Sequence, residues 1–81
     1  PVTLGTAEFD LLWLLASRAG EPLTRKAILA TLRNLPYDGT DRSIDIGVSR
    51  LRRKLGDDTE PPTRIKTLRG RGYQFVPDAW D

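Results

Sequence analysis

Residues 41–55 of this 81-residue chain read DRSIDIGVSRLRRKL, and the spacing of their apolar side chains predicts a long amphipathic helix. The apolar positions recur at intervals of four, three and four residues, at Ile44, Val48, Leu51 and Leu55. At about 100° per residue they fall within about 60° of one another, which makes one stripe that faces a core. Asp41 suits the N-cap and Gly56 suits the residue after the last turn, so the helix is expected to span 41–55.

The opposite side of this predicted helix is basic. Its members are Arg42, Ser43, Ile46, Arg50 and Arg53, with Gly47 and Ser49 at the edges. A helix fits the major groove of B-DNA, where Arg50 can pair with guanine and Ile46 can contact a thymine methyl. For each residue taken singly, a solvated surface is the alternative to DNA contact. The basic last turn, for example, also suits the helix dipole without any ligand. The five together favour a nucleic-acid interface, whereas Arg52 falls outside this face and is expected to be structural.

A β-hairpin is predicted after a polar, proline-containing loop. Its two β-prone runs and the turn between them are residues 65–68, 73–76 and 69–72. An arginine at a hairpin tip, here Arg69, can enter a narrow minor groove. The hydroxyls of Thr67 and Tyr73 beside the tip can donate hydrogen bonds to phosphates. The alternative is a charged turn that protects an exposed sheet edge.

Two shorter helices are expected before residue 41. The first begins near Thr6, the expected cap, and its spacing places on one apolar face Phe9, Leu12, Trp13 and Ala16. The second has Thr24 as N-cap and a set of apolar residues formed by Ala27, Ile28, Leu29 and Leu32. Residues 1–4 leave room for a short strand, and residues 35–39 read as a loop.

The order helix, helix, helix, hairpin predicts an α+β domain of the winged helix-turn-helix type. Three short helices cannot bury all their apolar faces against one another, so the hairpin is expected to close the core. A chain of 81 residues is long enough for one domain, which is expected to cover residues 1–81.

The charge is concentrated in the second half of the chain. Residues 1–41 hold four basic and five acidic side chains, whereas residues 42–76 hold nine basic and four acidic ones. Seven of those nine are arginine, which suits bidentate contact with phosphate and guanine. The asymmetry favours a nucleic-acid partner over an ordinary basic surface.

The residue inventory excludes several kinds of chemistry. The chain has no Cys and no His, so disulfides, zinc fingers and His-based catalysis are ruled out. No enzyme activity, cofactor or metal is expected, because the sequence shows no metal-ligand cluster, no phosphate-binding loop and no catalytic carboxylate pair. Asp57 and Asp58 are adjacent carboxylates, but they are expected to lie in a solvated loop. The longest apolar run, residues 11–16, is far shorter than the roughly 20 residues that cross a membrane. Because the chain starts with Pro1 and lacks Met, it is expected to be a piece of a longer protein.

Three stretches resemble the C-terminal effector domain of OmpR/PhoB-family response regulators. They read LGTAEF with LL at residues 4–12, RSID through SRLRRKL at residues 42–55, and IKTLRGRGYQF at residues 65–75. The segments YDG at 37–39 and AW at 79–80 are most similar to the RstA-like branch. Most of the N-terminal four-stranded sheet of that family is absent from this chain.

The resemblance implies a transcription factor of a bacterial two-component system, located in the cytoplasm. A sensor kinase would act on a receiver domain that this chain lacks, and homodimers would bind double-stranded DNA head to tail on tandem direct half-sites. The helix at about 41–55 would read the major groove and the wing at about 64–76 the minor groove. Carried over by position, DNA contacts fall on Arg42, Ser43, Ile46, Ser49, Arg50, Arg53, Thr67, Arg69 and Tyr73. A segment that contacts RNA polymerase in some members matches Leu35, Tyr37, Asp38 and Gly39.

Two other functions remain open at this point. A winged helix can serve protein interaction, with the basic face binding an acidic partner and only nonspecific affinity for DNA. RNA binding is the second, but readers of single strands need exposed aromatic platforms. Most of the six aromatic side chains are expected on core faces, which argues against RNA.

Overall fold

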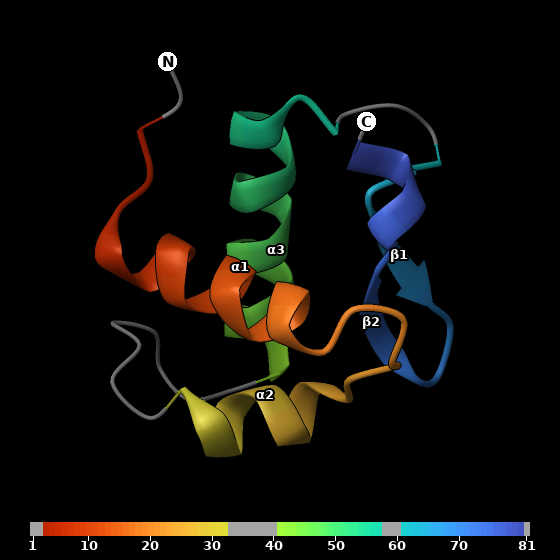
Figure 1. Cartoon of the computed structure of the whole chain (residues 1–81). Helices are drawn as coiled ribbons and strands as arrows, with labels where there is room; N and C mark the ends of the chain where they lie inside the picture. The colour runs from red at the N-terminus through yellow and green to blue at the C-terminus, as the bar shows by residue number, and fades with distance from the viewer. Residues whose placement is uncertain (1–2, 33–40, 58–60, 81) are drawn as a thin grey trace.

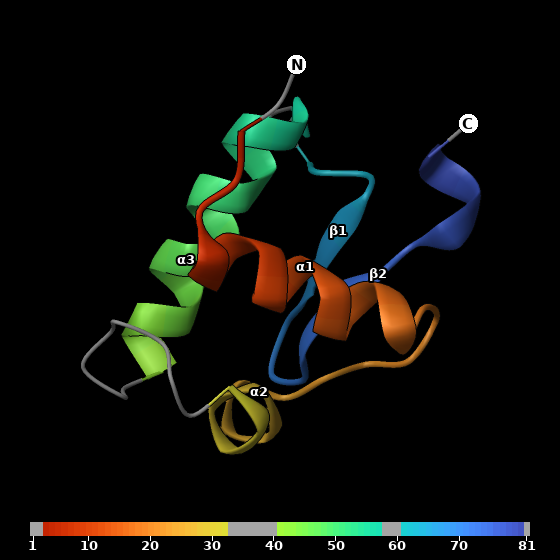
Figure 2. The same ribbon diagram turned by 60° about the vertical axis from the view of Figure 1, so that its left-hand side comes forward.

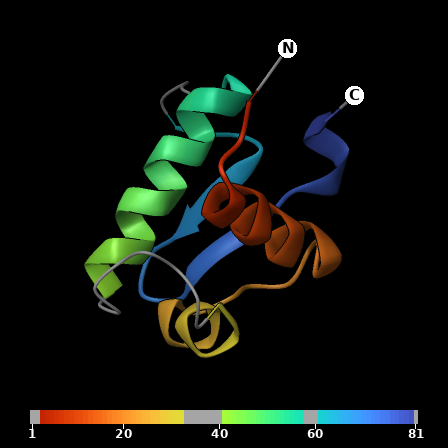
Figure 3. The same ribbon diagram turned by 90° about the vertical axis from the view of Figure 1, so that its left-hand side faces the viewer.

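The computed structural model describes residues 3–32, 41–57 and 61–80. Within them the elements are α1 (Thr6–Ser17), α2 (Arg25–Thr31), α3 (Asp41–Leu55), β1 (Ile65–Leu68), β2 (Gly72–Phe75) and a short 3-10 helix, η1 (Pro77–Trp80). The predicted order of three helices and a hairpin is confirmed, and α3 ends at Leu55 as predicted. Asp41 is the first residue of α3 and not its N-cap, so that part of the prediction is wrong. Helix α1 lies across α3, and α2 lies near the N-terminal end of α3 (Figure 1). The hairpin lies behind α1 and to the right of α3 in Figures 2 and 3.

The core forms where α1, α2, α3 and the hairpin meet. Its fully buried side chains are Leu11, Leu15, Ile28, Ile44, Val48, Leu51 and Ile65. Three of them come from α3, which confirms the predicted stripe, and Leu55 is partly buried at its end. Full burial of such a side chain contributes about 1.5 to 3 kcal/mol, so the rotation of α3 about its own axis is strongly determined.

The buried face of α1 differs from the predicted one. Leu11, Leu14 and Leu15 are buried, whereas Phe9 and Trp13 are 52% and 66% exposed. The two exposed rings stack on each other with centroids 6.2 Å apart. Residues 11–16 are apolar on nearly every side of the helix, so the three- and four-residue spacing fits two faces equally well. The expectation that most aromatic side chains lie on core faces is wrong for this pair.

The helix starts are set by short polar contacts. Gly5, not Thr6, is the N-cap of α1, and its N–H donates to Glu8 Oε1 at 2.8 Å. This bond is the glutamate half of a capping box. Thr24 caps α2 as predicted, because its hydroxyl accepts from the N–H of Ala27 at 3.0 Å. Ala27 itself is exposed and does not belong to the apolar set.

The hairpin is anchored to the segment between α1 and α2. β1 and β2 pair antiparallel with Ile65 opposite Phe75, and β2 begins at residue 72, one residue earlier than predicted. Leu23 and Tyr73 form an isolated bridge, with N–H to carbonyl distances of 2.8 and 2.9 Å. Gly72 has a φ of +105°, and a Cβ there would lie 2.0 Å from the Leu23 carbonyl oxygen. Only glycine fits this close approach, which holds β2, next to the turn of the hairpin, against the segment between α1 and α2.

Asp57 holds the junction between α3 and β1, although the sequence indicated a solvated pair with Asp58. The Asp57 side chain is buried, and Asp58 lies outside the described residues. Oδ1 accepts from the N–H groups of Thr63 and Arg64 at 2.9 and 3.0 Å, and Oδ2 accepts from that of Ile65 at 2.9 Å. Burial alone would raise the pKa of Asp57, but these hydrogen bonds hold it below its ordinary value.

Several predictions concern residues outside the described ranges. They include the loop at 35–39 and the proposed polymerase-contact residues Leu35, Tyr37, Asp38 and Gly39. Thr3 and Leu4 are described and are not in a strand, while the first two residues lie outside the described part.

Candidate nucleic-acid interface

The outer face of α3 is exposed and mostly basic. Packing of the apolar stripe into the core turns this face away from the protein. It forms an open, shallow hollow of about 440 Å³ lined by Arg42, Asp45, Ile46, Ser49, Arg50 and Arg53. Ile46 is 39% exposed among these charged side chains. A helix face of this kind matches what the major groove of B-DNA admits, with cations for phosphates and an apolar group for a thymine methyl.

Ser43 does not lie on this outer face. It is 5% exposed, so its predicted exposed position is wrong. Ser43 precedes Ile44 by one residue and lies about 100° from it around the helix, at the edge of the packed side. Arg50, which was predicted to share its face, is about 20° further from Ile44 around the helix and is exposed. A small rotational difference therefore separates a buried hydroxyl from a solvent-facing guanidinium.

The wing tip presents two arginines. Arg69, Gly70 and Arg71 are exposed between β1 and β2, and the N–H of Arg71 donates to the carbonyl of Leu68 at 2.8 Å. Gly70 has a φ of +75°, which the tight turn requires. The tip and the N-terminal half of α3 lie toward the same end of the molecule, the end that also holds α2 (Figures 1 and 2). One ligand that extends along this end can thus meet both elements.

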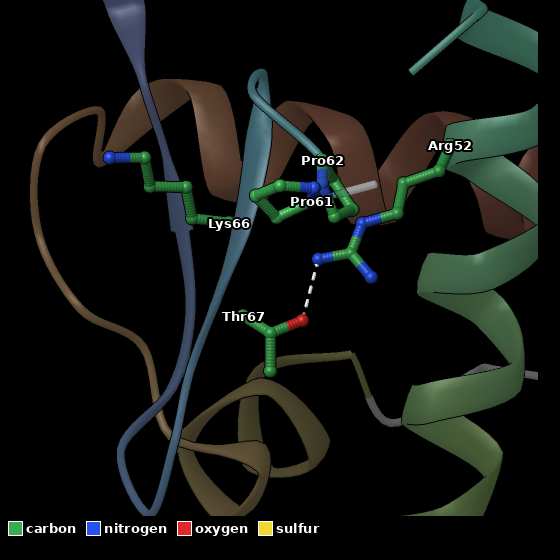
Figure 4. Close-up of a pocket in the computed structure, with 5 residues that line it drawn as sticks. All are labelled: Arg52, Pro61, Pro62, Lys66 and Thr67. Carbon is green, nitrogen blue, oxygen red and sulfur yellow. Dashed lines mark hydrogen bonds between the residues drawn. The ribbon is translucent and has the colours of Figure 1, made fainter. Parts of the chain in front are cut away.

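The two hydroxyl residues beside the tip differ in their surroundings. Thr67 is exposed, and its hydroxyl oxygen accepts from Arg52 Nη2 at 2.7 Å (Figure 4). The proton of that hydroxyl remains available for a phosphate. Tyr73 is only 4% exposed, and its hydroxyl donates to Asp45 Oδ1. The prediction that Tyr73 presents its hydroxyl to DNA does not agree with this burial.

Arg52 is structural, as predicted. Its Nε and Nη2 donate to the carbonyl of Ile65 at 2.9 and 2.6 Å, which ties α3 to β1. It also lines a recess of about 390 Å³ with Pro61, Pro62, Lys66 and Thr67, which Figure 4 shows between α3 and β1. These bonds hold the wing at one orientation relative to α3.

A polar cluster that was not predicted from the sequence joins α2, α3 and β2. Asp45 Oδ1 accepts from Arg25 Nε at 2.6 Å and from the hydroxyl of Tyr73. The guanidinium carbons of Arg25 and Arg52 lie 5.3 and 5.5 Å from the centroid of the Tyr73 ring, within cation–π range. Desolvation alone would raise the pKa of Asp45, but the hydrogen bonds from Tyr73 and Arg25 bring it below its ordinary value. Asp45 is therefore anionic at neutral pH.

Lys54 at the end of α3 faces the protein instead of the outer hollow. Its Nζ lies 2.6 Å from Glu8 Oε1 on α1, and Glu8 is nearly buried. The hydrogen bond from Lys54, followed by that from Gly5, lowers the pKa of Glu8. The pair fixes α1 against α3 and explains why the Glu8 side of α1 faces inward.

The described residues contain neither a metal-binding cluster nor a membrane-spanning segment. They hold no group of three or more acidic, His or Cys side chains that could bind a metal ion. Their helices are too short or too polar to cross a lipid bilayer.

A helix with a basic outer face, a hairpin with an arginine tip at the same end and a shared core define a winged helix-turn-helix domain. The family model described as "Transcriptional regulatory protein, C terminal" matches residues 1–75. The chain therefore belongs to this family, the C-terminal effector domains of OmpR/PhoB-type regulators. The family is one of transcriptional regulators and not of enzymes.

Individual relatives agree with this assignment. The chain is 52% identical over 80 residues to the transcriptional regulatory protein RstA of Escherichia coli K12, covering 99% of this chain and 34% of that protein. It is 45% identical over 75 residues to HprR of the same organism, covering 93% of this chain and 33% of that protein. The chain thus spans about a third of the length of the curated relatives it matches.

Solved structures show the same fold. The DNA-binding domain of Klebsiella pneumoniae RstA, solved in complex with the RstA box, has a TM-score of 0.83 and 54% identity, covering 94% of this chain and 75% of that chain. DrrB of Thermotoga maritima, described as an OmpR/PhoB homolog, has a TM-score of 0.80 and 36% identity, covering 93% of this chain and 34% of that chain. The predicted fold class and family are confirmed.

Proposed function

We propose that this chain binds double-stranded DNA sequence-specifically, as the effector domain of a response regulator that controls transcription. The observation that carries the proposal is the outer face of α3, which is exposed, arginine-rich and held in one orientation by a fully buried stripe. The Klebsiella relative that was solved with its DNA box supports it, because that domain is 54% identical to this chain.

Each element has a distinct part in the proposed docking. α3 enters the major groove, where Arg50 pairs with guanine O6 and N7 and Ile46 contacts a thymine methyl. The phosphates on either side are contacted by Arg42, Ser49 and Arg53. At the wing, Arg69 enters the minor groove and the Thr67 hydroxyl donates to a phosphate. Ser43 and Tyr73 are left out of this interface because both are buried.

Selection from a pool of random DNA duplexes tests the proposal, with Arg50→Ala as the variant. The wild-type protein is expected to enrich a motif that contains a guanine near a thymine. Arg50→Ala should lose about 1 to 3 kcal/mol on that motif and relax the preference at the guanine. Arg18→Ala removes one exposed charge just after α1 and serves as the control, with the motif unchanged.

One result would count against this function, and another would count against the role of Arg50 in it. If no motif is enriched, the sequence-specific function is wrong and the protein-interaction alternative is favoured. Single-stranded RNA belongs in the same experiment as a competitor, because the exposed stacked pair of Phe9 and Trp13 is the kind of platform that RNA readers use. An equal loss for Arg50→Ala on specific and random DNA would mean that Arg50 contacts only phosphate.

The remaining proposals concern the whole protein. We propose that residues 1–81 act as one winged-helix domain of a longer regulator in the bacterial cytoplasm. A sensor kinase would act on its receiver domain, and two copies would bind tandem direct half-sites head to tail. Contact with RNA polymerase would involve the segment that contains Leu35, Tyr37, Asp38 and Gly39.

A further inference from the structure

Asp45 stands out on the outer face of α3. It lines the same hollow as Arg42, Arg50 and Arg53, and its side chain is 44% exposed. A carboxylate at a surface that meets phosphates weakens binding by charge repulsion, whatever the DNA sequence. The only groups on DNA that a carboxylate can bind favourably in the major groove are the exocyclic amines of the bases.

The two oxygens of Asp45 are in different situations. Oδ1 accepts from Arg25 Nε at 2.6 Å and from the hydroxyl of Tyr73. Oδ2 has no hydrogen-bond partner among the residues that the structure describes. The carboxylate is ionised at neutral pH, so Oδ2 can act only as an acceptor.

The cluster holds this carboxylate in a fixed orientation. Arg25 belongs to α2, and Tyr73 is a buried residue of β2, so the two donors come from two different elements, and the guanidinium of Arg25 also lies over the Tyr73 ring. A side chain held in this way gives up little conformational entropy when it binds, which favours discrimination between bases.

We propose that Asp45 is a specificity-determining residue whose Oδ2 accepts a hydrogen bond from the amine of a cytosine or adenine in the major groove. This inference rests on the proposed DNA binding. Guanine and thymine present only acceptors in that groove, so Asp45 disfavours them at the position it faces. A preference of about tenfold for the amine-bearing bases is expected, which is at the lower end of what a specific contact supplies.

Asp45→Asn makes the proposal sharply testable. The Arg25 and Tyr73 donors still require an acceptor at the Oδ1 site, so the amide oxygen occupies it and the amide nitrogen faces the groove. An acceptor toward DNA is thereby replaced by a donor. At one position of the selected motif, the preference should switch from cytosine or adenine to guanine or thymine, while Asp45→Ala should remove it.

Affinities are measured on four duplexes that differ only at that position. Glu8→Gln is the matched control, because it breaks the ion pair with Lys54 of α3 but lies on the packed side. It should leave the base preference unchanged. A uniform change of affinity on all four duplexes for Asp45→Asn would overturn the proposal, since a structural or purely electrostatic role gives that result.

A second measurement leaves the protein intact and so does not depend on whether the variants fold. In wild type, N4-methylcytosine or N6-methyladenine replaces the natural base at that position, which places a methyl group on the amine that Oδ2 contacts. About a tenfold loss is expected with the modified base that corresponds to the preferred one, and this identifies cytosine or adenine. Unchanged affinity with both modified bases overturns the role of Asp45. A wild-type protein that does not distinguish its motif from random DNA instead refutes the proposed function itself.

Discussion

Asp57→Asn is expected to destabilise the domain, because the two oxygens of Asp57 serve three backbone donors. Oδ1 accepts from Thr63 and Arg64, and Oδ2 accepts from Ile65. An asparagine of the same shape supplies only one acceptor atom. With its oxygen at the Oδ1 site, two bonds are kept, and the amide nitrogen then faces the N–H of Ile65, donor against donor.

The magnitude follows from the burial of these groups. The N–H of Ile65 is buried, so leaving it unpaired costs about 1 to 3 kcal/mol. The two retained bonds change from a charged to a neutral acceptor, which costs about 0.5 to 1 kcal/mol each. A loss of about 3 kcal/mol is therefore expected, a large share of the roughly 5 to 15 kcal/mol that stabilises a typical domain.

The pH dependence provides an internal check. The pKa of Asp57 in the folded protein lies below its ordinary value of 3.8, so the carboxylate stabilises the fold above that pH. This contribution is lost as the pH falls through the folded-state pKa. Urea unfolding followed by circular dichroism, at pH 7 and at successively lower pH, should show the difference between wild type and variant shrinking below about pH 4.

Asp10→Asn is the control, because Asp10 is an exposed carboxylate on α1. It should change the free energy of unfolding by less than about 0.5 kcal/mol. If Asp57→Asn stays within about 1 kcal/mol of wild type at pH 7, the junction between α3 and β1 is not held as described.

Two further predictions concern docking on DNA. Arg69→Ala should lose most of the affinity difference between probes flanked by A·T and by G·C, and its slope of log affinity against log salt should become shallower by about one. If wild type and variant show the same difference between probes, Arg69 is a solubilising turn residue. Inserting five base pairs between tandem half-sites, whose centres are expected about 10 to 11 base pairs apart, should abolish pairwise binding measured by gel shift, and its survival would refute the head-to-tail arrangement.

The sequence determines the buried face of α3 but leaves two possible buried faces for α1. In α3 the apolar side chains other than Ile46 form one narrow stripe with charged residues on both sides, so only one orientation buries them. In α1 the run from Leu11 to Ala16 is apolar around most of the helix, and periodicity alone allows two faces. The Glu8–Lys54 pair agrees with only one of them, but it joins residues that are far apart in the sequence. Local spacing carries no information about such a contact.

The residues of the candidate site also differ in whether the local sequence determines their exposure. Exposure of Arg50 and Arg53 follows directly from the stripe on the other side of α3, and exposure of Arg69 follows from its place in the turn. The burial of Tyr73 could not be predicted in this way. Thr67 lies opposite Tyr73 in the hairpin and is exposed, whereas Tyr73 is buried.

That contrast depends on contacts from outside the hairpin. Arg52 reaches Thr67 from α3, and Tyr73 bridges to Leu23 and donates to Asp45. The sequence did contain one indication of this cluster, namely the carboxylate of Asp45 on a helix face whose other charged members are all arginines. An acidic residue there is unfavourable toward phosphates unless it has a second task, and in this fold the Oδ1 atom of Asp45 already has one. Its Oδ2 atom has no hydrogen-bond partner among the described residues, so this atom can serve base recognition while Oδ1 serves packing.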